Sequence, residues 1–476
     1  MNPYCRLIPR LNGTEIEEKF DQYLGLVNKG VAGFILFGGE IESARIKIAE
    51  LRDRAKRPFI IASDLEQGVG QQLTGGTLFP PALAVAAAMK TLGRRTAHTL
   101  LRKLYTAVAL EARYAGINTI FAPVLDINSN PKNPIIATRA FGEDSETVSF
   151  FGCEMIKTLQ QNGITACGKH FPGHGDTEDD SHITLPVIYK SLQDIERHEL
   201  VPFRKAIDVG VGMIMLGHLC VPAIDPLGIP ASLSRKANSY LRRTLGFRGI
   251  TITDAMNMGA IDGCHEDESS RRALEAGVDL ILHPTDPDKL ASYFREKRCD
   301  FGPLNHPACV TNQDYASVDF KEHRRLSREL TEMSVTVVGE KESKIRKPFL
   351  ILLNEDRGEK KLPFINAFRK FYPGICFCML LPEEEIPWEL IPKGSELIIG
   401  VFSAVKAWKG GATRWLQKSI QNLNDKATVF VSFGNPFPLR DVRKDVIKVF
   451  AYWDSEMAQE AAAEKLLRQL SQRTTR

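Results

Sequence analysis

Short apolar runs rich in β-branched and aromatic residues recur along the first part of the chain and predict the strands of a parallel sheet. There are eight such runs: Cys5–Ile8, Gly33–Phe37, Phe59–Ala62, Thr119–Ala122, Thr165–Gly168, Gly212–Leu216, Ile250–Thr253 and Asp279–Leu282. Between them lie helical patterns over Thr14–Asn28, Ala44–Ala55, Leu92–Ala115, Ser145–Gln161, Leu192–Val209, Ala237–Leu245 and Ser269–Ala276. Eight strands that alternate with helices predict an α/β fold of the (β/α)8 TIM-barrel type.

A charged run, EKESKIRK, ends this pattern near residue 340 and is typical of a linker. Beyond it, five strand-like runs cover Phe349–Leu353, Gly374–Leu380, Leu397–Phe402, Thr428–Phe433 and Val446–Ala451. Helical patterns separate them over Pro363–Phe371, Thr413–Leu423 and Met457–Leu470. We therefore predict a TIM-barrel catalytic domain over residues 1–340, a linker over 341–347, and a smaller α/β sandwich domain with a parallel sheet over 348–476.

Polar residues follow the predicted barrel strands at their carboxyl ends, which is where TIM barrels carry their chemistry. They are Asp64, Asp126, Lys169, His170, His218, Asp254 and His283. Strand ends that face only solvent would be more mixed and less acidic. This end of the barrel is therefore the predicted active site.

One stretch stands out at this end: KHFPGHGDTEDDSH, over residues 169–182, holds three histidines, a lysine and three aspartates around two glycines and a proline. Asp180 and His182 are two residues apart, so on an extended loop both can point to the same side. The carboxylate can then bond one imidazole nitrogen and leave the other free to exchange a proton, as a general acid and base does. The alternative is a surface aspartate beside a solvated histidine.

Asp254 ends an apolar strand, and a carboxylate held there can attack an anomeric carbon and form a covalent glycosyl-enzyme. The sequence equally allows Asp254 to be a helix N-cap. Lys169 and His170 can bond neighbouring hydroxyls of a sugar, whereas His174 is expected to brace the loop between Gly173 and Gly175. Glu66 adds a second carboxylate beside Asp64 after the third strand.

Arg139, on the long loop after the fourth strand, either bonds a substrate hydroxyl or pairs structurally with Asp126 or Glu143. Zinc ligation by His170, His174 and His182 is an alternative for the histidine-rich loop. Pro172 and the two glycines forbid the helix that would align these rings, so we expect no metal and no other cofactor.

Composition narrows the class of protein. Among the 476 residues, 62 Lys and Arg stand against 58 Asp and Glu, and a net charge of +4 does not indicate a polyanion partner. The nine cysteines are scattered and form no CxxC pair, and neither a signal peptide nor a membrane-length apolar run is visible. We therefore expect a cytoplasmic protein with neither a nucleic-acid nor a membrane partner. We also favour a monomer, although composition does not address the oligomeric state.

Several segments together resemble family 3 of the glycoside hydrolases, in its β-N-acetylglucosaminidase branch. They are VAGFILFGGEI, DLEQG, FAPVLDINSNPKNPIIATRAFGED, KHFPGHGDTEDDSHITLPVI, PASLSRKANSYLRRTLGFRG and ITDAMNMGAI, in order along most of the first 340 residues. The combination of KHFPGHG with DSH is specific, because β-glucosidases of the family keep the KH but lack the DSH.

The resemblance implies roles for individual residues. Asp254 is the nucleophile, and His182, supported by Asp180, is the acid and base. Asp64, Arg139, Lys169 and His170 hold the non-reducing N-acetylglucosamine. This implies a retaining exo-β-N-acetylglucosaminidase, a β-hexosaminidase that removes terminal N-acetylglucosamine from peptidoglycan fragments (muropeptides) during cell-wall recycling.

One segment departs from the family pattern. Relatives usually read DQEGGRVxR after the third strand, and this chain has DLEQGVGQQ from Asp64 to Gln72, without either arginine. Either the substrate preference has shifted or another basic group substitutes. The alternatives are a β-glucosidase, an N-acetylglucosaminide phosphorylase, since a neutral histidine base would not repel phosphate, a sugar-binding pseudoenzyme, and a zinc hydrolase.

Overall fold

The computed structural model describes residues 2–177, 185–257, 265–299, 301, 317–339, 345–355, 362–403 and 412–471. The chain divides into two compact units. The first comprises residues 1–79, 93–130 and 140–326, and the second comprises residues 80–92, 131–139 and 327–476. The expected linker lies partly outside the described residues, which resume at Ile345, and the expected domain limits stay a prediction.

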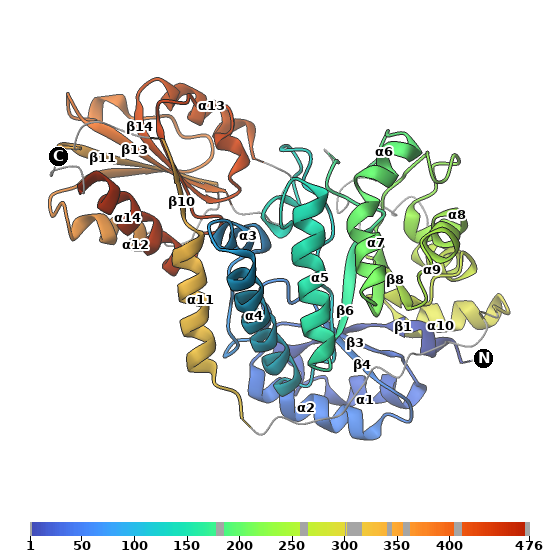
Figure 1. The fold of residues 1–476 in the computed structure, drawn as a ribbon. Coiled ribbons are helices and arrows are strands. Elements are labelled where there is room, and N and C mark those ends of the chain that lie inside the picture. The colour runs from blue at the N-terminus through green and yellow to red at the C-terminus, as the bar shows by residue number, and fades with distance from the viewer. Residues whose placement is uncertain are drawn as a thin grey trace. The chain divides into compact units, whose positions relative to one another are not determined.

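A parallel sheet forms the centre of the first unit (Figure 1). Its order is β1-β9-β8-β7-β6-β5-β4-β3-β2. The strands are β1 (Leu7–Ile8), β2 (Arg10–Asn12), β3 (Gly33–Phe37), β4 (Ile60–Ser63), β5 (Thr119–Ile120), β6 (Thr165–Phe171), β7 (Met213–Leu216), β8 (Ile250–Ala255) and β9 (Leu280–Leu282).

The two ends of this sheet are consecutive in the chain, on either side of Pro9. β1 pairs with β9, and β2 pairs with β3. Pro9 has no N–H to donate but its carbonyl accepts from Ile35 N at 2.9 Å, so the interrupted strand still joins both neighbours. The sheet therefore closes into the predicted α/β barrel.

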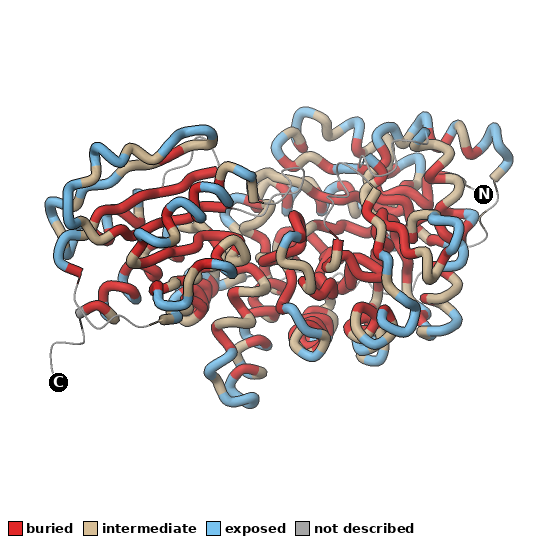
Figure 2. Tube along the Cα trace, turned by 90° about the horizontal axis from the view of Figure 1, so that it is seen from above, coloured by how far each residue is buried: buried red, intermediate tan, exposed pale blue. Residues whose placement is uncertain are grey.

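Helices follow the strands and cover the outside of the barrel. They are α1 (Phe20–Lys29), α2 (Ile41–Arg54), α4 (Arg94–Tyr114), α5 (Ser145–Gln161), α6 (Leu192–Arg197), α7 (Leu200–Asp208), α8 (Arg235–Ser239), α9 (Glu266–Glu275) and α10 (Pro287–Glu296). Most strand residues of the barrel are buried, and exposed residues lie mainly on the outer helices and turns (Figure 2). Alternate strand residues fill the interior, including Ile35, Ala62, Cys167, Met215 and Ile252.

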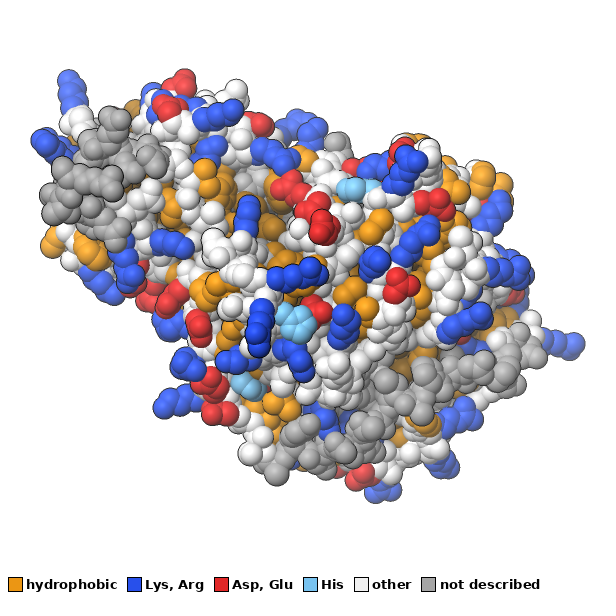
Figure 3. Space-filling view, viewed as in Figure 1, with side chains coloured by type: hydrophobic (Ala, Val, Ile, Leu, Met, Phe, Trp, Pro, Cys, Tyr) orange, Lys and Arg blue, Asp and Glu red, His pale blue; other side chains and the backbone are white. Residues whose placement is uncertain are grey.

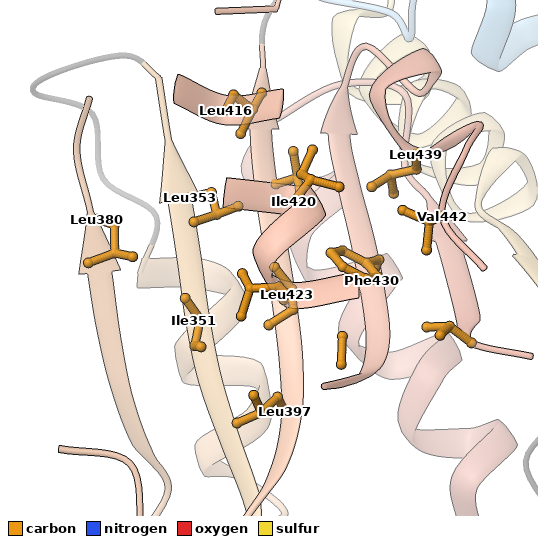
Figure 4. Close-up of a cluster of buried hydrophobic side chains, with 14 of the residues drawn as sticks. Ile351, Leu353, Leu380, Leu397, Leu416, Ile420, Leu423, Phe430, Leu439 and Val442 are labelled. Atoms are coloured by element: carbon orange, nitrogen blue, oxygen red, sulfur yellow. The ribbon is translucent and has the colours of Figure 1, made fainter. Parts of the chain in front are cut away.

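The second unit contains a six-stranded sheet in the order β10-β15-β14-β13-β11-β12. The strands are β10 (Thr336–Val338), β11 (Pro348–Asn354), β12 (Cys376–Leu380), β13 (Glu396–Ser403), β14 (Ala427–Gly434) and β15 (Ile447–Phe450). α13 (Arg414–Asn424) covers one face, and Figure 4 shows its Leu416, Ile420 and Leu423 over the sheet. α12 (Leu362–Arg369) and α14 (Glu456–Ser471) lie on the other face (Figure 1).

The unit also includes α3 (Ala82–Met89), and α11 (Phe320–Ser334) spans the division between the units.

Three sequence expectations were wrong in detail. The first strand was expected over Cys5–Ile8, but Pro3–Arg6 form a 3-10 turn that the Asn2 side chain caps, and the strand begins at Leu7. The second sheet is not wholly parallel, because β10 pairs antiparallel with β15. The helix expected over Leu192–Val209 is two helices, with His198 in a non-helical conformation between them.

Candidate active site

A buried lysine joins the ends of two barrel strands. Lys169, in β6, is only 3% exposed at its side chain. Its Nζ lies 2.6 Å from Asp64 Oδ1 and 2.8 Å from Glu66 Oε1, both of which follow β4. Because a buried cation needs compensating charge, the two carboxylates hold the ammonium in a fixed place at the carboxyl ends of the strands.

A second charged cluster lies beside the first and is centred on Asp126, which is fully buried. Its Oδ2 accepts from His170 Nδ1 at 2.6 Å, and its Oδ1 accepts from the backbone N–H groups of His170 and His174 at 3.1 and 2.7 Å. Asp126 therefore fixes the orientation of the His170 ring, and it also holds the first turn of the glycine-rich loop.

The electrostatics of this cluster follow from burial. Burial acts to raise the pKa of Asp126, but the adjacent His170 outweighs it, and the pKa of that carboxyl is lowered. Burial, together with the charge of His170, lowers the pKa of His174 to about 4. His174 Nδ1 donates to Thr177 Oγ1 at 2.8 Å. A histidine that stays neutral and bonded within its loop fits the expected bracing role.

The base of the loop is fastened by another ion-paired lysine. Lys190 Nζ lies 3.0 Å from Asp176 Oδ2 and 2.7 Å from Glu199 Oε1. Asp176 also accepts from Ser129 Oγ at 3.1 Å. The proposed acid and base pair, Asp180 and His182, lies outside the described residues, between these two fastened ends.

Asp254 lies near the end of β8, at a β-bulge. Ile252 pairs with Leu280 and Ala255 pairs with Leu282, so β8 has one residue more than β9 over this interval. Along β8 the alternation places Ile250 and Ile252 in the barrel interior, and Asp254 follows at the carboxyl end. Its Oδ1 accepts from the Ala255 N–H at 2.8 Å.

Arg139 ends a short 3-10 turn, Ala137–Arg139, within the segment 131–139 that belongs to the second unit. Its guanidinium donates to Ile135 O at 3.1 Å. The expectation that Arg139 bonds the sugar stays a prediction.

The segment that lacks the family arginines has amides instead. Gln71 Oε1 accepts from Gln67 N at 2.8 Å, and Gln72 contacts Gly38 N and Asp64 O at 3.4 and 3.5 Å. The basic partner of Asp64 is Lys169, which comes from another strand. Asp64 therefore has a cation beside it in the absence of the two arginines.

Residues 14–299 match the sequence model of the glycosyl hydrolase family 3 N terminal domain. The chain belongs to glycoside hydrolase family 3. Among its relatives, a β-hexosaminidase of Nitrosomonas eutropha is 34% identical over 292 residues, which is 58% of this chain and 80% of that protein. A β-N-acetylglucosaminidase/β-glucosidase of Cellulomonas fimi is 32% identical over 58% of this chain, which spans only half the length of that relative.

A solved family 3 structure extends the similarity to both units. The β-N-acetylglucosaminidase of Paenibacillus sp. str. FPU-7 has a TM-score of 0.78 at 27% identity, covering 99% of this chain and 97% of that one. The fold expected from the family resemblance is therefore confirmed for the barrel and for the second α/β unit.

The structure adds two pairings that the sequence analysis did not predict. Glu66 is the second carboxylate on Lys169, and Asp126 is the partner of His170. Both belong to the strand-end set, but the pairings join residues far apart in sequence. Within the described ranges, no three His, Cys, Asp or Glu side chains are grouped to hold a metal ion.

The outer surface carries no concentrated charge on the face that Figure 3 shows, where Lys and Arg are spread singly with Asp and Glu between them. Among the described helices, none combines the length and apolar character that a membrane crossing needs.

Proposed function

We propose that this chain is a retaining exo-β-N-acetylglucosaminidase that removes terminal N-acetylglucosamine from peptidoglycan fragments. The observation that carries the proposal is the set of charged groups at one end of the barrel. Lys169 with Asp64 and Glu66, Asp126 with His170, and Asp254 all lie at the carboxyl ends of parallel strands. Clusters of buried, ion-paired groups at this end of a barrel are typical of active sites.

In the proposed reaction, the Asp254 carboxylate attacks the anomeric carbon of the bound sugar. The bond from that carbon to the glycosidic oxygen breaks, and the leaving oxygen takes a proton from His182, whose ring Asp180 supports. Water, deprotonated by the same histidine, then attacks the glycosyl-enzyme from the face that the aglycone left, and Asp254 is released. Two inversions give retention of the β configuration.

Ion pairs within the protein hold the proposed binding groups in place. The Lys169 ammonium, held by Asp64 and Glu66, and the His170 ring, held by Asp126, are fixed donors toward hydroxyls of the sugar. Fixed donors lose little side-chain entropy when a ligand binds, which favours orientation of the reacting carbon.

The names of the β-hexosaminidase of Nitrosomonas eutropha and the β-N-acetylglucosaminidase of Paenibacillus support the N-acetyl preference, and KHFPGHG with DSH supports the choice of a histidine acid and base. The peptidoglycan origin of the substrate and a cytoplasmic recycling role belong to the same proposal, as does the contribution of Arg139 to sugar binding.

The test compares four substrates: 4-nitrophenyl β-N-acetylglucosaminide and β-glucoside, and a muropeptide with and without its terminal N-acetylglucosamine. We expect turnover of the N-acetylglucosaminide well above that of the glucoside, and release of free N-acetylglucosamine from the muropeptide. Added phosphate should leave the product unchanged. A sugar phosphate as product would indicate a phosphorylase, and saturable binding without any turnover would indicate a pseudoenzyme.

A further inference from the structure

The pairing of β8 with β7 stops before β8 itself ends. β7 pairs with β8 only as far as Leu216, opposite Thr253. After that, the Gly217 N–H donates to Phe171 O in β6 at 3.0 Å, and its carbonyl accepts from Ser232 N at 3.2 Å. The backbone beyond β7 therefore bonds elsewhere, although β8 continues past Asp254 to Ala255.

On the side of β8 where pairing with β7 has ended, the side chain of His218 makes a hydrogen bond to the backbone of β8. His218 is fully buried, and its Nε2 lies 3.0 Å from the carbonyl oxygen of Ala255. Because a carbonyl oxygen can only accept, Nε2 carries the proton and donates it. On the other side of β8, the N–H of the same peptide unit, that of Met256, donates to Leu282 O at 3.0 Å.

Ser232 fixes the His218 ring. Its hydroxyl lies 2.7 Å from His218 Nδ1, and Ser232 is itself fully buried. With Nε2 donating to Ala255 and Nδ1 bonded to this hydroxyl, both ring nitrogens have partners, which sets the ring orientation.

The β-bulge at Asp254 connects the hydrogen bond from His218 to the position of the Asp254 side chain. The extra residue in β8 takes it out of register with β9, and Thr253 Oγ1 accepts the Leu282 N–H at 3.1 Å. The peptide unit after Ala255 is held on both sides, by His218 and by Leu282. The N–H of Ala255 itself donates to Asp254 Oδ1.

We propose that His218 is a positioning residue for Asp254. By holding the Ala255 carbonyl, it keeps the end of β8 in the register at which the Ala255 N–H bonds the carboxylate and aims it at the anomeric carbon. This inference rests on the proposed role of Asp254 as the nucleophile.

The matched pair His218→Gln and His218→Asn tests it, because both variants carry the same amide. A glutamine amide nitrogen can reach the place of Nε2 and still donate to Ala255, whereas an asparagine reaches only the place of Nδ1 and Ser232. With 4-nitrophenyl β-N-acetylglucosaminide we expect His218→Gln to keep kcat within about tenfold of the wild type. His218→Asn should lose about 100-fold in kcat with little change in KM, as a displaced catalytic group does.

A structural role alone would lower kcat equally in both variants, in proportion to a shared loss of Tm, and that result would overturn the proposal. A loss confined to KM would overturn it too.

Hydrogen–deuterium exchange of the peptide over residues 250–257 measures, without substrate, how firmly the end of β8 is held. We expect faster exchange in His218→Asn than in His218→Gln, and equal exchange would contradict the inference even if the wild type proved inactive on this substrate. A wild type without turnover but with the expected exchange difference would instead count against the proposed function alone.

Discussion

The carboxyl ends of the barrel strands and those of the second sheet are both polar, but their polar groups are used differently. In the second sheet, Glu355 follows β11, its Oε2 accepts from Ser403 Oγ at 2.7 Å and its Oε1 from the Thr413 N–H at 2.7 Å. Thr413 is the N-cap of α13, so this carboxylate ties two strands to a helix. In the barrel, Lys169 forms ion pairs with two carboxylates, and His170 bonds a third.

Polar strand ends alone therefore do not mark an active site. What distinguishes the barrel is the crowding of opposite charges in a buried place, where each charge is costly unless another compensates it. The following predictions test charged or titratable groups of the barrel and, last, the carboxylate of Glu355 in the second sheet.

The largest effect is expected from Lys169→Met. The side chain is buried, and its removal leaves Asp64 and Glu66 without the cation between them, which should cost about 3 to 5 kcal/mol of unfolding free energy. We expect kcat/KM to fall at least about 100-fold, since the proposed donor to the sugar is lost as well. Urea unfolding and steady-state kinetics measure the two effects. Near-normal kcat/KM in a folded variant would show that this lysine is only structural.

Acid should destabilise the barrel in a histidine-dependent way. His174 has a folded-state pKa of about 4, below the ordinary value of 6.5, so the unfolded chain binds more protons between these limits. The unfolding free energy should therefore fall as the pH drops from 6.5 toward 4, by about 3 kcal/mol for this group.

His283, whose pKa burial also lowers to about 4, adds to the same loss. Residues 327–476 contain no histidine, so the second unit lacks this contribution. Denaturant unfolding of His174→Gln over this pH range should give a flatter dependence than the wild type. An unchanged slope would contradict the assignment.

Asp126→Asn should have an intermediate effect. An asparagine oxygen can still accept from the backbone N–H groups of His170 and His174, but the charge that orients the His170 ring is lost. We expect a loss of about 1 to 3 kcal/mol in stability and about tenfold or more in kcat/KM. Calorimetry and kinetics on the same preparation separate the two losses. A stability loss with unchanged kcat/KM would remove His170 from the sugar site.

The smallest effect is expected from Glu355→Gln in the second sheet. A glutamine can still accept one of the two hydrogen bonds, from Ser403 or Thr413, so the stability loss should be about 1 kcal/mol. We expect kcat/KM to stay within about twofold of the wild type. A loss of kcat/KM as large as that of Asp126→Asn would mean that the polar strand ends of the barrel and of the second sheet do not differ in function.

Much of the fold could be predicted from the sequence, because strands buried on both faces leave continuous apolar runs such as Gly33–Phe37 and Ile250–Thr253. Two helices that were not predicted, α10 and α11, have clear amphipathic patterns, but the other misses carry weak local patterns. β10 has three residues at a sheet edge, and the break at His198 depends on packing rather than on a proline or glycine.

The site was predicted only as a set of strand ends. The sequence selected Lys169, His170, Asp64 and Asp254 as candidates by their places after apolar runs, but it did not pair them. Lys169 and Asp64, which form an ion pair, are 105 positions apart. No local pattern tells which charged groups pair across a closed barrel. For the same reason, the bond from His218 to the end of β8 could not be predicted, although His218 was recognised as a strand-end residue.

The most direct test of the central claim, that Asp254 is the nucleophile, is rescue of Asp254→Gly by azide. With 4-nitrophenyl β-N-acetylglucosaminide, whose leaving group needs no proton, the variant alone should be slower than the wild type by several orders of magnitude. Azide, entering the space of the missing carboxylate, should restore release of 4-nitrophenolate and give the α-glycosyl azide, identified by its anomeric proton. Wild-type turnover without azide, or a β-glycosyl azide as the product, would contradict the account.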